Sequence, residues 1–118
     1  MNGQGSTFTS VAPSRLLDTR RADSAIAGRL EAGKEYRLPF ETLAGASGAV
    51  SLTLTIAAPA GPGFLSAGPC GTLGGHSNLN FSGDGARANQ AVLPLAGGVC
   101  VMSSSAADLI VDLTGVFP

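Results

Sequence analysis

Apolar and polar residues alternate most strictly between Ala49 and Ala57, in the stretch AVSLTLTIA. Aliphatic residues stand at every second position from Val50 to Ile56, and serine or threonine fills the positions between them. Successive side chains of a β-strand point to opposite faces, so this pattern predicts a strand with one aliphatic and one hydroxyl face. The aliphatic face must be covered by a second sheet, and we therefore expect this strand at the centre of the fold.

Shorter alternating or apolar runs, bounded by Gly, Pro and Asp, bring the total to about eight expected strands. They are an extended segment that starts at Pro13 and the runs 34–40, 63–68, 77–81, 91–95, 99–103 and 108–117. The run 34–40 contains Pro39 and is expected near a sheet edge. The runs 91–95 and 99–103 are joined by a glycine-rich turn and are expected to form a hairpin. Residues 22–33 are expected to be a surface loop.

The last run is expected to close the structure. Its apolar residues expected to share one face are Leu109, Val111, Leu113 and Phe117. Asp112 then falls on the other face. Short strands at even spacing, without a substantial helix, predict an all-β fold: an antiparallel two-sheet β-sandwich of jelly-roll or Greek-key type. We expect a single such domain over residues 13–118, preceded by an N-terminal arm over residues 1–12.

Composition supports this fold class and limits the classes of function. Of the 118 residues, 44% are hydrophobic and only 13% are charged, the opposite of the bias that keeps a chain disordered. A net charge of -1 offers no basic surface, so a nucleic-acid partner is not expected. Membrane insertion is not expected either, because no apolar run is long enough. The first ten residues lack the features of a signal peptide, so we expect a protein used without export or a domain excised from an exported chain.

The two cysteines, Cys70 and Cys100, allow two interpretations. A disulfide between them would close a loop of roughly 30 residues and stabilise the fold by about 3–4 kcal/mol on the chain-entropy model. Alternatively, both are buried thiols that pack as small hydrophobic groups. We favour the disulfide, because a small all-β domain gains most from a cross-link. With one distant histidine the pair lacks the spacing of a zinc site, and no metal or other cofactor is expected.

Charged residues concentrate near the start of the chain. Arg15, Asp18 and Arg20 could hold a ligand carboxylate or phosphate, because guanidinium groups bind planar anions through paired hydrogen bonds. They could instead form a structural ion-pair network with Asp112 that joins the first and last strands. We favour the network, because covered charges are seldom left unpaired.

Three asparagines, Asn78, Asn80 and Asn89, are candidate polar contact residues. They could hydrogen-bond the hydroxyls of a sugar, with Phe81 as a stacking platform, or satisfy backbone groups in turns and bulges. We favour the structural role, because a chain with one Tyr and no Trp offers little aromatic surface for a sugar.

The single histidine, His76, lacks the sequence context of a catalytic base. Ser77 is adjacent, but neighbouring residues of a strand face apart, and no G-x-S-x-G motif occurs. Asp84, in a glycine-flanked turn, is one carboxylate and too few for a calcium site. We therefore expect no catalytic residues and no enzymatic activity.

The motifs PSRLLDTR, PAGPGFLSAGPCG, HSNLN and DLIVDLTGVF occur in this order from about Pro13 to the C-terminus. With them the chain resembles a small all-β domain that recurs in secreted proteins of actinobacteria and in virion proteins of their phages. The resemblance implies a non-catalytic surface module with its cysteine pair bonded. Together with the low charge, it leads us to expect a homo-oligomeric structural protein on a virion surface, docked on a capsid. The alternative is a secreted adhesion or carbohydrate-binding module of a bacterial surface protein, with a glycan as its ligand.

Overall fold

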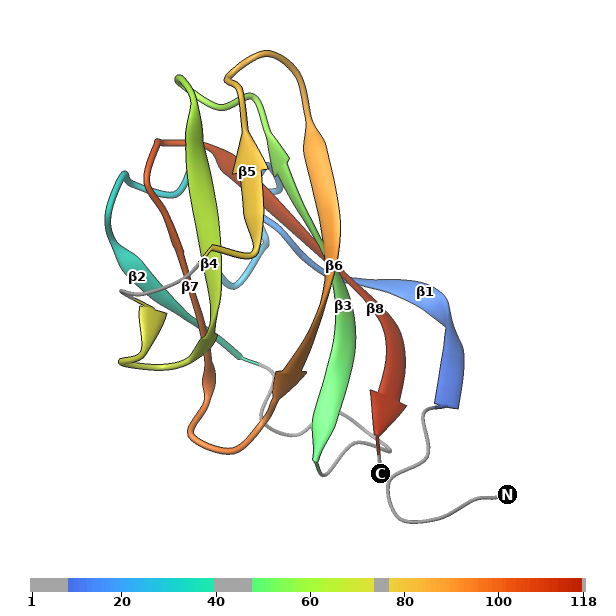
Figure 1. The fold of residues 1–118 in the computed structure, drawn as a ribbon. Coiled ribbons are helices and arrows are strands. Elements are labelled where there is room, and N and C mark those ends of the chain that lie inside the picture. The colour runs from blue at the N-terminus through green and yellow to red at the C-terminus, as the bar shows by residue number, and fades with distance from the viewer. Residues whose placement is uncertain (1–8, 40–47, 74–76, 118) are drawn as a thin grey trace.

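A computed structural model describes residues 9–39, 48–73 and 77–117, and every feature below lies in these ranges. The described chain forms eight strands in two four-stranded sheets that pack face to face (Figure 1). The predicted all-β sandwich is confirmed. The strands are β1 (Thr9–Asp18), β2 (Glu35–Leu38), β3 (Ala49–Ala57), β4 (Gly63–Pro69), β5 (Leu79–Phe81), β6 (Arg87–Pro94), β7 (Val99–Ser103) and β8 (Asp108–Phe117).

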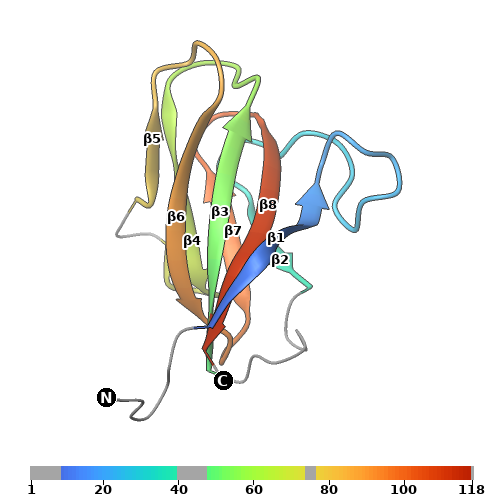
Figure 2. The same ribbon diagram turned by 90° about the vertical axis from the view of Figure 1, so that its right-hand side faces the viewer.

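The strand order shows which kind of sandwich this is. One sheet runs β1-β8-β3-β6 and the other β2-β7-β4-β5, with antiparallel neighbours throughout. The first four strands therefore pair with the last four in reverse order, β1 with β8 and so on to β4 with β5. This nested pairing, rolled into two sheets, is the jelly-roll topology. Figure 2 shows the first sheet from its outer side, with β6 and β1 at its edges.

The core between the sheets is aliphatic, and β3 lies at its centre. The inward residues of β3 from Val50 to Ile56 are each at most 1% exposed, and β8 supplies the equally buried Leu109 and Val111. Burial of one such side chain stabilises the fold by about 1.5–3 kcal/mol relative to leaving it in water. Thr53 and Thr55 point to the outer side and are half-buried, as the alternation predicts.

Residues 19–34, which include the loop expected over 22–33, contain no regular strand, and the Leu30 side chain attaches them to the core. Leu30 is completely buried in the core cluster and forms an isolated antiparallel bridge with Ala107. The two residues exchange backbone hydrogen bonds of 2.7 and 3.3 Å. Leu30 thus attaches this loop to the residue just before β8.

The expectation that Phe117 shares a face with Leu109, Val111 and Leu113 is wrong. Leu52 of β3 lies opposite Leu113, but the preceding Ser51 lies opposite Gly115, so Thr114 is an extra residue in β8. Such a β-bulge shifts the alternation by one position. The core residue beyond the bulge is Val116, which is 7% exposed and part of the core cluster. The Thr114 hydroxyl lies over β3, where it donates to the Ser51 side chain at 3.0 Å.

The expected hairpin of 91–95 with 99–103 is also wrong. β6 pairs with β3 in one sheet, whereas β7 pairs with β2 and β4 in the other. The turn between them is closed by a 3.1 Å bond from Gly98 N to Leu95 O, and Gly97 and Gly98 both have positive φ. These backbone conformations, which glycine adopts without strain, direct the chain across the sandwich.

Two strands begin earlier than expected. β1 starts at Thr9, inside the segment assigned above to an arm, and Thr9 and Ser10 pair through their backbone with Val116 and Gly115 of β8. β6 starts at Arg87, where its polar residues continue the ladder with β3. The predicted edge position of β2 is confirmed.

Candidate functional site

The largest cluster of charged side chains lies where β1 ends beside β8. The Arg20 amide donates to Asp18 Oδ1 at 3.1 Å, an Asx turn that stops the strand. The Arg20 guanidinium also binds both carboxylate oxygens, at 2.9 Å each. Asp18 is only 6% exposed. The Arg20 side chain is the main cause that holds the pKa of Asp18 well below its usual range, against the opposing effect of desolvation.

Arg15 links this turn to the last strand. It lies opposite Asp112 in the β1–β8 register, and its Nε donates to Asp112 Oδ1 at 2.9 Å. Its Nη1 reaches Asp18 Oδ2 at 3.4 Å. The hydrogen bond that Arg15 donates to Asp112 is the main reason that the pKa of Arg15 is raised. The structure therefore brings together all four residues proposed for the ion-pair network, and we call this cluster the β1–β8 clamp.

A second layer of bonds, not expected from the sequence, lies behind the clamp. Thr19 is 1% exposed, and its hydroxyl donates to Asp108 Oδ1 at 2.9 Å while accepting from the Leu109 amide at 3.0 Å. Arg29 Nη1 lies 3.8 Å from the other Asp108 oxygen. The only sequence signal for this layer was the position of Thr19 inside the charged motif.

A shallow hollow of about 740 Å³ opens beside the clamp. Its charged lining residues are Arg15, Arg21, Asp18, Asp23 and Asp112. Two arginines against three aspartates give the lining one net negative charge (2 − 3 = −1). Arg21 forms a bidentate ion pair with Asp23, with hydrogen bonds of 3.1 and 3.2 Å. Arg15 is already paired with Asp112 and Asp18. An anionic ligand would have to displace these carboxylates, so the arrangement favours the structural role over an anion clamp.

The candidate polar contact residues mostly bond the backbone. Asn78 Oδ1 accepts from the Ala67 amide at 2.7 Å, and Asn89 Nδ2 donates to the Asn78 carbonyl at 2.9 Å. These two side chains therefore join β4, β6 and the segment before β5 along one side of the sandwich. Asn80 is exposed on β5 and accepts from Ser77 Oγ at 3.0 Å.

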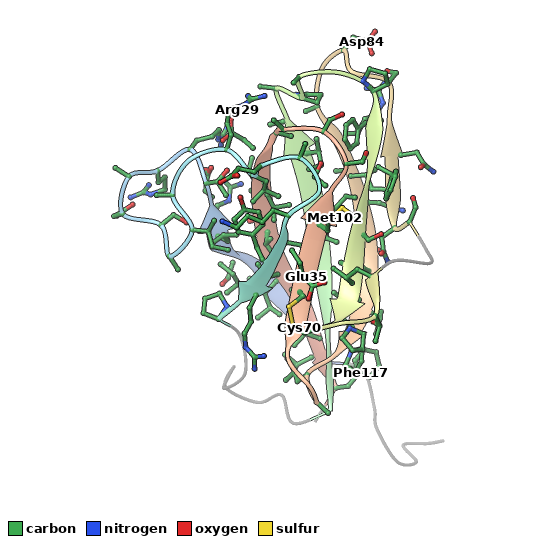
Figure 3. All side chains as sticks on the ribbon, turned by 90° about the vertical axis from the view of Figure 1, so that its left-hand side faces the viewer. Arg29, Glu35, Cys70, Asp84, Met102 and Phe117 are labelled. Atoms are coloured by element: carbon green, nitrogen blue, oxygen red, sulfur yellow. A yellow bond between two sulfur atoms is a disulfide. The ribbon has the colours of Figure 1, made fainter. Side chains whose placement is uncertain are left out.

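The predicted disulfide between Cys70 and Cys100 is confirmed. Cys100 stands between the core residues Val99 and Val101 and therefore faces the outer side of its sheet, where it is nevertheless 3% exposed. Figure 3 shows Glu35 of β2 beside Cys70 on this side. A Glu35 oxygen and both sulfurs lie within 4.8 Å of one another, the only such potential ligand group among the described residues. Sulfurs bonded to each other are not thiolate ligands, so this group does not form a metal site.

His76 lies outside the described residues. Asp84 is exposed, accepts a hydrogen bond from Ser82 Oγ and pairs with Arg87 at 4.0 Å. The Ser82 bond is the main cause that lowers the pKa of Asp84.

Comparisons with family models, with curated proteins and with solved structures found no match to this chain. Within the described ranges, no helix has the length and apolar character required to cross a membrane.

Proposed function

We propose that this chain is a non-catalytic structural module that docks on a larger protein assembly, with a phage virion as the favoured assembly. The observation that carries the proposal is an uncharged outer surface formed by β3 and β6. Thr53 and Thr55 of β3 lie in register with Gln90 and Ala88 of β6, and Val92 of β6 lies opposite the buried Ser51. We call Thr53, Thr55, Ala88, Gln90 and Val92 the neutral face.

Val92 gives this face an apolar contact point. It is 58% exposed, and it is the one large hydrophobic side chain found exposed in the described part of the chain. The centres of protein interfaces are depleted of charged residues, because burying a charge without a partner is costly. The neutral face can therefore be covered by another protein at low cost in solvation.

The rest of the polar chemistry stabilises the fold itself. The clamp joins the first and last strands, the asparagines Asn78 and Asn89 join strand edges, and the disulfide joins β7 to the turn after β4. A rigid cross-linked sandwich suits a protein exposed on a particle. Jelly rolls are frequent in capsid and lectin domains, but the fold alone does not determine function.

Binding to capsids that lack this protein tests the proposal. Wild-type protein should co-sediment with them to saturation. Val92→Asp should weaken binding about tenfold, because it places a charge in the contact. Ala96→Asp adds the same charge at an exposed turn outside the neutral face and should bind like wild type. Capsids that bind neither wild type nor the control would overturn the virion assignment, and equal binding by all three would overturn the neutral face.

The disulfide specifically favours a second candidate, a secreted adhesion module. Disulfides persist in oxidising extracellular surroundings and are rare in the cytosol. The same three proteins should therefore be tested on purified bacterial cell-wall glycans. Saturable glycan binding by a monomeric protein, without capsid binding, would establish the adhesion module and exclude the first proposal.

A further inference from the structure

The two sulfurs of the disulfide lie in different surroundings. Cys70 belongs to the turn that follows β4 and is half-buried, whereas Cys100 is the second residue of β7 and is 3% exposed. On β7, Cys100 lies between Arg37 of β2 and Gly68 of β4 in the ladder. In a reduced chain a solvent-borne reagent would therefore reach Cys70 first.

A permanent positive charge lies next to the accessible sulfur. Arg37 Nη1 is 4.0 Å from Cys70 Sγ. The guanidinium lies directly against the turn at Gly98, where a Cβ would come within 2.6 Å of Arg37 Cζ. The glycine thus provides the space for Arg37 beside Cys70. A guanidinium at this distance favours a thiolate over a thiol, and the thiolate is the nucleophile.

Glu35, on β2 like Arg37, has the opposite effect on the Cys70 thiolate. Its carboxylate lies within 4.8 Å of both sulfurs, and it also accepts a hydrogen bond from the Gly71 amide at 3.1 Å. A nearby negative charge disfavours a thiolate. The reactivity of Cys70 is therefore set by two neighbours whose charges act in opposite directions.

We propose that, in the reduced chain, Cys70 is a peroxide-reactive thiol and Cys100 is its resolving partner, so that the disulfide closes without an enzyme. The Cys70 thiolate attacks one oxygen of a hydroperoxide, the O–O bond breaks, and the leaving oxygen departs as water or an alcohol after protonation. Cys70 becomes a sulfenic acid. The Cys100 sulfur then attacks Cys70 Sγ, the S–O bond breaks and water leaves, taking up the proton of the Cys100 thiol.

The fold already provides the geometry for the second step. The Cα atoms of Cys70 and Cys100 are 4.9 Å apart, within the usual range for a disulfide, so the sulfurs can bond without movement of the strands. Two thiols and one hydroperoxide yield one disulfide, one water from the second step, and one water or alcohol from the first. Accessible thiolates beside a resolving cysteine are the usual arrangement of peroxide-sensitive pairs.

Rates of closure test the roles of the two charges. The protein is reduced, freed of reductant without air, checked by circular dichroism and treated with hydrogen peroxide while free thiols are counted. Arg37→Gln should slow closure about threefold or more, and Glu35→Gln should accelerate it, because one removes a positive and the other a negative neighbour. Arg37→Lys should stay near wild type. General destabilisation cannot produce opposite effects, and equal rates in all four proteins would overturn the proposal.

Trapping identifies the reacting sulfur. In Cys100→Ser, peroxide and dimedone should label Cys70, because no resolving thiol is present. In Cys70→Ser, Cys100 should remain largely unlabelled. If either variant is unfolded, limited alkylation of reduced wild-type protein, read by peptide mass spectrometry, decides the same point. Faster modification of Cys100 than of Cys70 would refute the assignment.

Discussion

Asp18 shows how one carboxylate can secure several parts of this fold. It accepts from the Arg20 backbone, from the Arg20 guanidinium and from Arg15, which in turn holds Asp112 on β8. The acid therefore shapes the turn and, through Arg15, joins two strands. Both arginines are about half exposed, so the bonds compete with water, but the carboxylate itself is covered.

The first prediction concerns Asp18→Asn. The pKa of Asp18 is lowered in the folded state, so its contribution is complete above the unfolded value of about 4 and is lost as pH falls. At pH 7 the variant should lose about 1–2 kcal/mol of unfolding free energy, and this deficit should shrink at pH 3. Urea unfolding at both values measures it. Asp23→Asn, in an exposed pair, should change little, and a deficit independent of pH would contradict the ionic explanation.

The second prediction concerns the central core residue Leu54. It is 1% exposed on β3, and Leu54→Asp would bury a charge with no partner. We expect this variant to be unfolded by circular dichroism. Val92→Asp makes a similar apolar-to-acid change on the neighbouring strand at an exposed site and should remain folded. A folded Leu54→Asp protein would show that the alternation does not define the core.

The network residues could be predicted because charge is scarce in this chain. With only 13% charged residues, a group of arginines and aspartates near a strand end requires partners, and Asp112 is an acid in the interior of the closing strand. Thr19 could not be predicted in the same way. A threonine is compatible with surface and interior alike, and its bonds to Asp108 and Leu109 depend on a chain separation of about 90 residues.

At the scale of single elements, alternation predicts a strand but not its irregularities. Leu113 and Gly115 of β8 lie opposite the adjacent residues Leu52 and Ser51 of β3, so Thr114 between them is the bulged residue. Nothing in the local pattern DLIVDLTGVF marks Thr114 as an extra residue. It is extra only relative to β3, and the sequence does not show the register between the two strands. Alternation also does not show which strands pair. The runs on either side of Gly97 are both strands, as expected, but they belong to different sheets and do not form the expected hairpin.

The third prediction concerns the turn between β5 and β6. Gly83 and Gly85 both have positive φ, of 99° and 81°, so alanine is strained at either position. At Gly83 a Cβ would also lie 2.8 Å from the backbone of Gly61 and Pro62, whereas at Gly85 it meets nothing within 4 Å. Gly83→Ala should therefore lose about 1–2 kcal/mol more than Gly85→Ala in thermal or urea unfolding. Equal losses would show that this contact is easily relieved.

At the scale of the whole molecule, the nested pairing of the jelly roll connects the two ends of the chain. β1 pairs with β8, and β3 lies between β8 and β6, so each half of the chain completes the sheets of the other. Sequence patterning predicted two covered sheets because each strand has one apolar face. It left the order open, because the alternation is the same for any partner, and the jelly roll was one of two types expected.

The last prediction follows from this interdependence and uses hydrogen exchange. The disulfide lies in the β2-β7-β4-β5 sheet, whereas β3 lies in the other sheet. On the chain-entropy model a cross-link acts on the unfolded state, so its reduction lowers global stability by about 3–4 kcal/mol. Amides of β3, bonded on both edges and exchanging through global unfolding, should then exchange about two to three orders of magnitude faster, like those of β7. Mass spectrometry of oxidised and reduced protein under identical conditions tests this. Acceleration confined to β4, β7 and the turn at Cys70 would show that the cross-link holds only its surroundings, and that the two sheets unfold separately.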